Sequence, residues 1–171
     1  MDIRFNDSNF YDLERKNGLL YLTVQAIHEG SSNEGTDIKF ILDTGAYMTV
    51  ISRGTAIQCG FNRLPKTEVT LHGFSGGIAA DAVRIPGLKV MGKIYTDVPV
   101  MIPHELYRIN HDTGEEKQMA EVLGLNILGY YDYYVDSTKS RLYLKETATP
   151  YFYDIKLKSG QIFTNRDYNG N

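Results

Sequence analysis

The stretch KFILDTGAYMTVIS, residues 39–52, places an acidic residue directly after an apolar run. The three apolar residues before Asp43 have the composition of a buried β-strand. A carboxylate that leaves a buried strand costs free energy unless hydrogen bonds or a function compensate for it. Thr44 supplies a hydroxyl for such bonds, and Gly45 permits a tight turn and a close approach of another segment. The stretch therefore predicts a strand that delivers a functional carboxylate to a turn.

The surrounding pattern of short alternating apolar runs, separated by glycines and polar turns, predicts an all-β protein. The segment HGFSGG, residues 72–77, is expected to form the tip of a hairpin because glycines favour tight turns. The polar segment 105–121 is expected to be a loop with at most a helical turn. Strands are further expected at residues 20–26, 39–42, 49–51, 69–71, 83–85, 88–90 and 98–102, and within 121–146 a short helix followed by two strands.

Length and composition exclude several classes of protein. The chain has 171 residues, of which 42% are hydrophobic and 23% charged, as in a soluble single domain. A net charge of −3 gives no basic footprint for nucleic acid. Cys59 is the single cysteine and the four histidines share no metal-like spacing, so no disulfide, metal or cofactor is expected. No apolar run approaches the ~18 residues of a membrane span and the first residues resemble no signal peptide, so a cytoplasmic protein is expected.

An ordered set of motifs resembles the retropepsin-like aspartic peptidases. D-T-G-A at 43–46 is followed by T-V-I at 49–51, and HGFSGG lies where that family carries its substrate-covering flap. LGLNILG at 123–129 matches the segment that precedes the family's C-terminal helix, and YYVDSTKSRLYL at 133–144 matches the strand pair after it. D-T-G alone is weakly specific and also fits an ordinary β-turn, but the ordered set is far more specific.

The resemblance implies a closed, all-β acid-protease barrel with a flap hairpin and one short C-terminal helix. It places the active site on the twofold axis of a homodimer. The peptidase domain is expected at residues 19–146, after an N-terminal extension at 1–18. The C-terminal extension at 147–171 is expected to add strands or a dimer interface.

The resemblance also implies an aspartic endopeptidase with Asp43 of each subunit as the catalytic residue. Two carboxyls that share a proton take unlike ionisation states, so the ionised one activates water while the protonated one assists the amide. Thr44, Gly45 and Ala46 would support the active-site loop. An extended peptide would bind under the flap as an added strand. The implied flap residues are His72, Gly73, Phe74, Ser75, Gly76 and Gly77, and the candidates for apolar pockets are Ala46, Val50, Phe74, Ile78 and Ile102.

The sequence departs from the family pattern at two places. Tyr47 and the pair Leu125–Asn126 stand where viral members carry an acidic residue and an arginine that form a salt bridge. Both partners are missing together, so no buried charge is left unpaired. The dimer is therefore expected to be held in another way, through the C-terminal extension.

Two alternatives compete with this interpretation. A second D-T-G triplet at Asp112 suggests a two-lobed enzyme, but its polar surroundings predict a solvated loop. A non-catalytic peptide-binding or dimerisation module is the other alternative. The retention of Asp43, Thr44 and Gly45 argues against it, because a binding module gains nothing from a costly pair of carboxylates.

Overall fold

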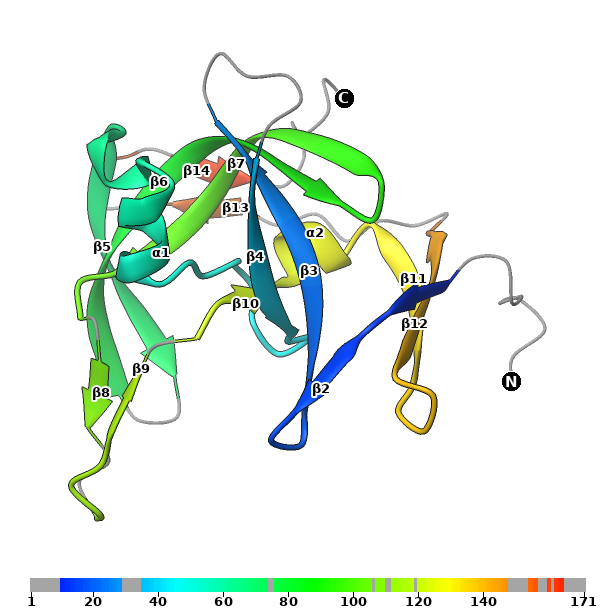
Figure 1. Cartoon of the computed structure of the whole chain (residues 1–171). Coiled ribbons are helices and arrows are strands. Elements are labelled where there is room, and N and C mark those ends of the chain that lie inside the picture. The colour runs from blue at the N-terminus through cyan, green and yellow to red at the C-terminus, as the bar shows by residue number, and fades with distance from the viewer. Residues whose placement is uncertain are drawn as a thin grey trace.

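The computed structural model describes residues 10–28, 35–73, 76–105, 107–109, 112–118, 120–147, 154–156, 160 and 162–164 (Figure 1). Its helices are α1 (Arg53–Gln58), the 3-10 helix η1 (Phe61–Arg63) and α2 (Leu125–Leu128). Its strands are β1 (Phe10–Asp12), β2 (Glu14–Lys16), β3 (Leu19–Ile27), β4 (Gly35–Leu42), β5 (Lys66–Gly73), β6 (Gly76–Val90), β7 (Lys93–Pro103), β8 (Tyr107–Ile109), β9 (Glu116–Gln118), β10 (Val122–Leu123), β11 (Tyr131–Asp136), β12 (Arg141–Glu146), β13 (Asp154–Lys156) and β14 (Ile162–Thr164).

The largest sheet has the strand order β10-β4-β3-β6-β5, with β2 paired to β3 and β7 paired to β6. In Figure 1, β3 and β4 run through the middle of the molecule. Along β3, Leu22 and Val24 are buried and Thr23 between them is exposed, as expected of a strand with one face on the core. The all-β prediction and the first predicted hairpin, β3–β4, are thus confirmed.

The short strand β10 runs parallel to β4 and places Leu123 beside Leu42. Parallel neighbours cannot be joined by a tight turn, so this pairing brings together segments that lie far apart in the sequence. The end of β4, where Asp43 follows, is consequently held by the C-terminal half of the chain.

The second predicted hairpin is also confirmed, as β5–β6. Its register runs from Lys66 opposite Val83 to Gly73 opposite Gly76. Strand β7 accompanies β6 only as far as the pair Ala80–Pro103. The last four residue pairs of the hairpin, from Thr70–Ala79 to Gly73–Gly76, therefore extend beyond β7 as a two-stranded ribbon.

Two features of the fold differ from the sequence-based expectations. Helix α1 was not expected, and it forms because Ser52 caps it by accepting a hydrogen bond from the Thr55 N–H. The segment 105–121, expected to be a loop, contains the paired strands β8 and β9. Closure of the barrel stays a prediction: the order of the main sheet ends at β10 and at β5, and Val50 makes isolated bridges to Val122 in β10 and to Met101 in β7.

Both predicted extensions contain strands. Strand β1 pairs with β12 and β2 pairs with β3, so residues 10–16 belong to the sheets of the domain. Strands β13 and β14 pair with each other. No helix in the described part of the chain has the length and apolar composition of a membrane-spanning segment.

Two apolar clusters fill the interior. The large one lies between the main sheet, α1 and α2, and contains the fully buried Phe40, Ile85 and Ile127. The small one consists of Met48, Ala82 and Met101, with Val50, Val69 and Leu71 packed against it. The small cluster connects the segment after Asp43 to the β5–β6 hairpin.

Candidate active site

Asp43 is exposed and lies one residue beyond the end of β4. Its backbone N–H donates to the carbonyl of Leu123 at 3.1 Å, which continues the β4–β10 pairing into the loop. Its Oδ1 accepts a hydrogen bond from the Gly45 N–H at 2.9 Å, in the manner of an aspartate that caps its own turn. A Cβ at position 45 would lie 3.2 Å from that oxygen, so glycine leaves the carboxylate uncrowded. The turn therefore presents an oriented carboxylate to the solvent.

The loop after Asp43 lies against the segment that joins β10 to α2. The Leu125 N–H donates to the Ala46 carbonyl at 2.8 Å, and the Asn126 N–H donates to the Tyr47 carbonyl at 3.0 Å. Both donors belong to the first turn of α2, whose N–H groups have no partner within the helix. The helix start and the loop thus satisfy each other's backbone groups. Tyr47 itself is 62% exposed.

Gly124 lies in tight contact with the backbone of this loop. A Cβ built at position 124 would lie 2.6 Å from the Met48 carbonyl carbon and oxygen, and 2.9 Å from the Ala46 carbonyl oxygen. All three are backbone atoms, so no side-chain rotation can relieve the overlap. Glycine is therefore required here for close packing.

Replacing Gly124 with alanine is expected to lower the free energy of unfolding by about 1–3 kcal/mol, the usual cost of overpacking. Urea denaturation of the two proteins measures this difference. Gly92, where a Cβ would meet no atom within 4 Å but φ is +80°, provides the control, since its substitution tests backbone strain without overlap. Equal stability of the Gly124→Ala variant and the wild type would contradict the described packing.

Asn126 holds the same loop from within the interior. Its side chain is fully buried, and its Oδ1 accepts hydrogen bonds from the Thr49 N–H at 2.8 Å and the Thr49 hydroxyl at 2.7 Å. Its Nδ2 donates to the carbonyl of Pro99 in β7 at 3.0 Å. The Thr49 hydroxyl oxygen also accepts a hydrogen bond from the Gly124 N–H at 3.2 Å. One amide therefore joins three segments: the loop, β7 and α2.

The segment after the loop is held by a carboxylate of a different kind. The Glu121 Oε1 accepts hydrogen bonds from the hydroxyls of Ser52 and Thr55, the latter at 2.6 Å, and from the Ser52 N–H at 3.3 Å. Glu121 directly precedes β10, so it connects that strand to the start of α1. The half-buried carboxylate of Glu121 therefore holds the start of α1 in place, whereas the carboxylate of Asp43 faces the solvent.

The register of the β5–β6 hairpin decides which of its residues face the loop. Val69 and Leu71 contact the small cluster around Met48 and therefore occupy one face of β5. Side chains alternate along a strand, so the even-numbered residues, His72 among them, occupy the opposite face. A contact between His72 and the substrate stays a prediction. The register does not favour this contact, because it places His72 on the face opposite Val69 and Leu71.

The remaining predicted residues are distributed as follows. Thr44 is exposed beside Asp43, and Ala46 is half-buried. Gly73 pairs with Gly76 and His72 with Gly77 in the hairpin. Ile102 belongs to the large core cluster, whereas Val50 contacts the small one. Phe74 and Ser75 lie outside the described residues.

The second D-T-G triplet lies elsewhere. Asp112, Thr113 and Gly114 are exposed between β8 and β9, and the Thr113 hydroxyl accepts a hydrogen bond from the Glu115 N–H at 3.3 Å. Among the described strands, none pairs beside this aspartate in the way that β10 pairs with β4. Within the described residues, no group of three or more histidine, cysteine, aspartate or glutamate side chains could hold a metal ion.

Two groups of polar contacts in the structure were not predicted from the sequence. Asn126 lies inside the apolar segment LGLNILG, and a lone polar residue in such a run is the signal that could have identified it. The second group, around Asp81 and His104, has no signal in the sequence because its members come from four separate elements.

The fold agrees with comparisons to known proteins. The structure superimposes on a retropepsin-like aspartic protease from Rickettsia conorii with a TM-score of 0.53 and 20% identity, covering 78% of this chain and 96% of that one. The EIAV protease in complex with the inhibitor HBY-793 gives a TM-score of 0.48 and 18% identity, over 69% of this chain and 89% of that one. The likeness to the Rickettsia protein shows that the chain has the all-β retropepsin-like fold.

The sequence defines the family more closely. Residues 30–130, more than half of the chain, match the family described as "gag-polyprotein putative aspartyl protease". The chain belongs to this family of aspartyl proteases. It is also 28% identical over 133 residues to DNA damage-inducible protein 1 of Neurospora crassa, an alignment that covers 78% of this chain and 26% of that protein. The chain thus spans about a quarter of the length of this relative.

Proposed function

We propose that the chain is an aspartic endopeptidase whose active site is assembled from two copies. The observation that carries the proposal is the exposed carboxylate of Asp43, oriented by its own turn and held by β10 and α2. Acid–base hydrolysis of an amide needs two carboxyl groups in unlike protonation states. The described part of the chain has one aspartate in this setting, and a symmetric dimer provides the second. The cytoplasm stays the predicted location.

The proposed mechanism uses water as the nucleophile. The ionised Asp43 carboxylate takes a proton from water as the water oxygen attacks the peptide carbonyl carbon. The protonated Asp43 of the other copy hydrogen-bonds to the carbonyl oxygen and then donates a proton to the departing amide nitrogen. The two carboxyls titrate as a pair, so the pH profile of activity belongs to both. Thr44 would support the meeting of the two loops.

The substrate in this proposal is an extended peptide that lies between the Asp43 loop and the β5–β6 hairpin. Backbone groups of an extended peptide can pair with a strand, and alternate side chains then point to the same side. The partly buried Val50, Val69 and Leu71, which pack against the small apolar cluster, would favour apolar substrate side chains.

Cleavage of an unbiased peptide mixture, followed by mass spectrometry from acidic to neutral pH, tests this function. We expect cuts next to apolar residues. A chain that binds peptides from the mixture without cutting them would instead support the non-catalytic alternative.

Activity is expected to depend on protein concentration, because the site exists only in the assembled dimer. Specific activity should fall as the protein is diluted below the dissociation constant of the dimer. Sedimentation or light scattering over the same dilution series would show whether the loss follows the appearance of monomer. A fully active monomer would contradict the two-copy mechanism.

A further inference from the structure

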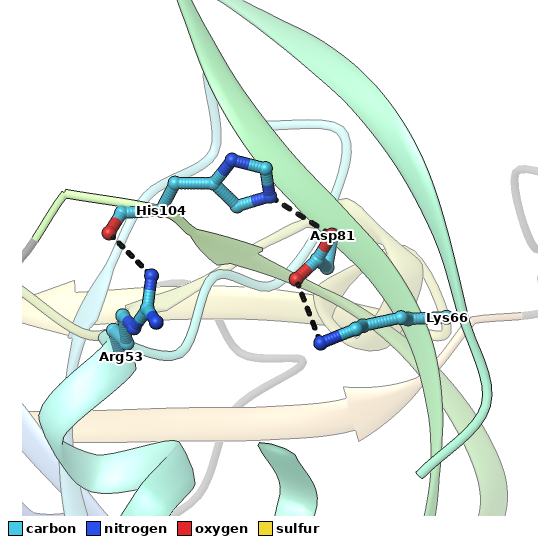
Figure 2. Close-up of polar contacts among 4 residues, drawn as sticks. All are labelled: Arg53, Lys66, Asp81 and His104. Carbon is cyan, nitrogen blue, oxygen red and sulfur yellow. Dashed lines mark hydrogen bonds and ion pairs between the residues drawn. The ribbon is translucent and has the colours of Figure 1, made fainter. Parts of the chain in front are cut away.

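Figure 2 shows polar contacts among four residues at the β5–β6 hairpin: Arg53 of α1, Lys66 of β5, Asp81 of β6 and His104, which follows β7. In β6, the Asp81 Oδ1 lies 2.9 Å from the Nε2 of His104, which follows the end of β7. The Asp81 Oδ2 lies 3.8 Å from the Nζ of Lys66, the first residue of β5. The Nη1 of Arg53, the first residue of α1, donates to the carbonyl of His104 at 2.9 Å. The side chain of Asp81 is 19% exposed and that of His104 is 34% exposed.

The contact between Asp81 and His104 lies where the hairpin loses β7 as its neighbouring strand. Strand β7 stops accompanying β6 at the pair Ala80–Pro103, and Asp81 and His104 immediately flank that pair. The His104 N–H makes a further hydrogen bond to the Ala79 carbonyl at 3.0 Å. The ribbon from Thr70 to Ala79 therefore begins where side chain and backbone of His104 both hold β6.

Backbone hydrogen bonds connect the region of this contact to the segment that follows the Asp43 loop. Two residues before Arg53 lies Ile51, whose N–H donates to the Met101 carbonyl at 3.0 Å. The Met101 N–H in turn donates to the Thr49 carbonyl at 2.9 Å. His104 thus follows the end of β7. This strand is hydrogen-bonded on one side to residues 49–51, after the Asp43 loop, and on the other side to β6 of the hairpin.

The opposite face of the hairpin is the one that faces the proposed peptide. Asp81 and Lys66 share one face, since Asp81 lies opposite Glu68 and side chains alternate along each strand. Val69 and Leu71 occupy the other face, against the small apolar cluster. Asp81 can therefore influence substrate binding only by fixing where the hairpin lies.

We propose that Asp81 and His104 are positioning residues, which set the orientation of the β5–β6 hairpin over the Asp43 loop and thereby the affinity for peptide. The proposal rests on the proposed peptidase function. It assigns neither residue to the chemical step. Ion pairs at partly exposed sites add little to stability, so a purely structural role would leave peptide binding unchanged.

Kinetics of four variants test the assignment. Asp81→Ala and His104→Ala are each expected to raise KM for a peptide substrate, lowering kcat/KM by about tenfold to a hundredfold with kcat little changed. The double variant should lose no more than either single one, because both remove the same contact. His104→Gln, which retains a side-chain donor, should recover most of the affinity.

Arg84→Ala is the matched control. Its Nη1 lies 3.3 Å from the Asp97 Oδ2, so it too removes a cation–carboxylate pair between β6 and β7, but away from the ribbon. Unchanged KM in Asp81→Ala and His104→Ala, or an equal rise in Arg84→Ala, would overturn the proposal.

Hydrogen exchange of the backbone amides gives a readout that does not need activity. The amides of residues 70–73 and 76–79 should exchange faster in Asp81→Ala than in the wild type, and Arg84→Ala should leave them unchanged. Unaltered exchange in Asp81→Ala would overturn the positioning role even if the wild type were inactive. An inactive wild type with faster exchange in this variant would refute the peptidase function while supporting the control of the hairpin by Asp81.

Discussion

Asp43→Asn is expected to lower kcat/KM for peptide cleavage at least about a thousandfold, since acid–base catalysis by positioned groups typically contributes 10²–10⁴-fold. The substitution removes the group that takes the proton from water in both copies of the dimer. An amide in this position still accepts the hydrogen bond from the Gly45 N–H, which the Asp43 Oδ1 accepts at 2.9 Å. The loop should therefore keep its shape, and the peptide should still bind. Cleavage rates and the affinity for an uncleaved peptide, measured on the same preparation, separate chemistry from binding.

Asp112→Asn is the matched control for this loss, because it changes the aspartate of the exposed D-T-G triplet between β8 and β9. It should retain the activity of the wild type. Equal cleavage by the wild type and by Asp43→Asn would show that another group is the catalyst. Loss of activity in Asp112→Asn alone would indicate that the wrong triplet had been assigned.

Asn126→Ala is expected to lower the free energy of unfolding by about 2–5 kcal/mol, because unsatisfied buried polar groups cost about 1–3 kcal/mol each. The Thr49 N–H and the Pro99 carbonyl would both lose their partner in the interior. Removal of the carboxamide would also leave a space beside β7. The Asp43 loop depends on this amide, so peptidase activity should fall further than stability alone requires. Denaturant unfolding and cleavage assays at a temperature where the variant is folded measure the two effects.

Asn62→Ala provides the comparison, since Asn62 lies exposed in the 3-10 helix η1. Surface substitutions of this kind change stability by no more than about 0.5 kcal/mol. A stability loss in Asn126→Ala no larger than that in Asn62→Ala would contradict the buried hydrogen-bond network described for the loop.

The fold was predictable where the sequence signal is local. Alternation along Leu22–Ala26 and the glycines of residues 72–77 depend on neighbouring residues only, and both hairpins follow from them. Helix α1 escaped prediction because Thr49–Ile51 continues a β-like apolar run up to its start. Its cap depends on Ser52 together with the distant Glu121, and such a partner cannot be recognised from the local sequence.

The candidate site was likewise predictable only where its sequence signal is local. Asp43 to Ala46 form a contiguous motif, and an acidic residue after an apolar strand identifies them without a structure. Asn126 and Gly124 act through contacts with Thr49 and Met48, across a parallel pairing that no local pattern encodes. Asp81 and His104 belong to no motif in the sequence. Their contact depends on where β7 stops pairing with β6, and no local pattern encodes that position.

The hydrogen bond between Thr49 and Asn126 also orders events during synthesis. The two residues are 77 positions apart in the chain, so the loop is translated long before its support. Closing so long a segment is entropically costly, and contacts of this range form only once most of the domain has been made. A nascent chain that has not yet reached Asn126 consequently carries the D-T-G-A sequence without the amide that holds the loop. Under the proposed function, the peptidase site would then be completed only after residue 126 has been made and two copies have met.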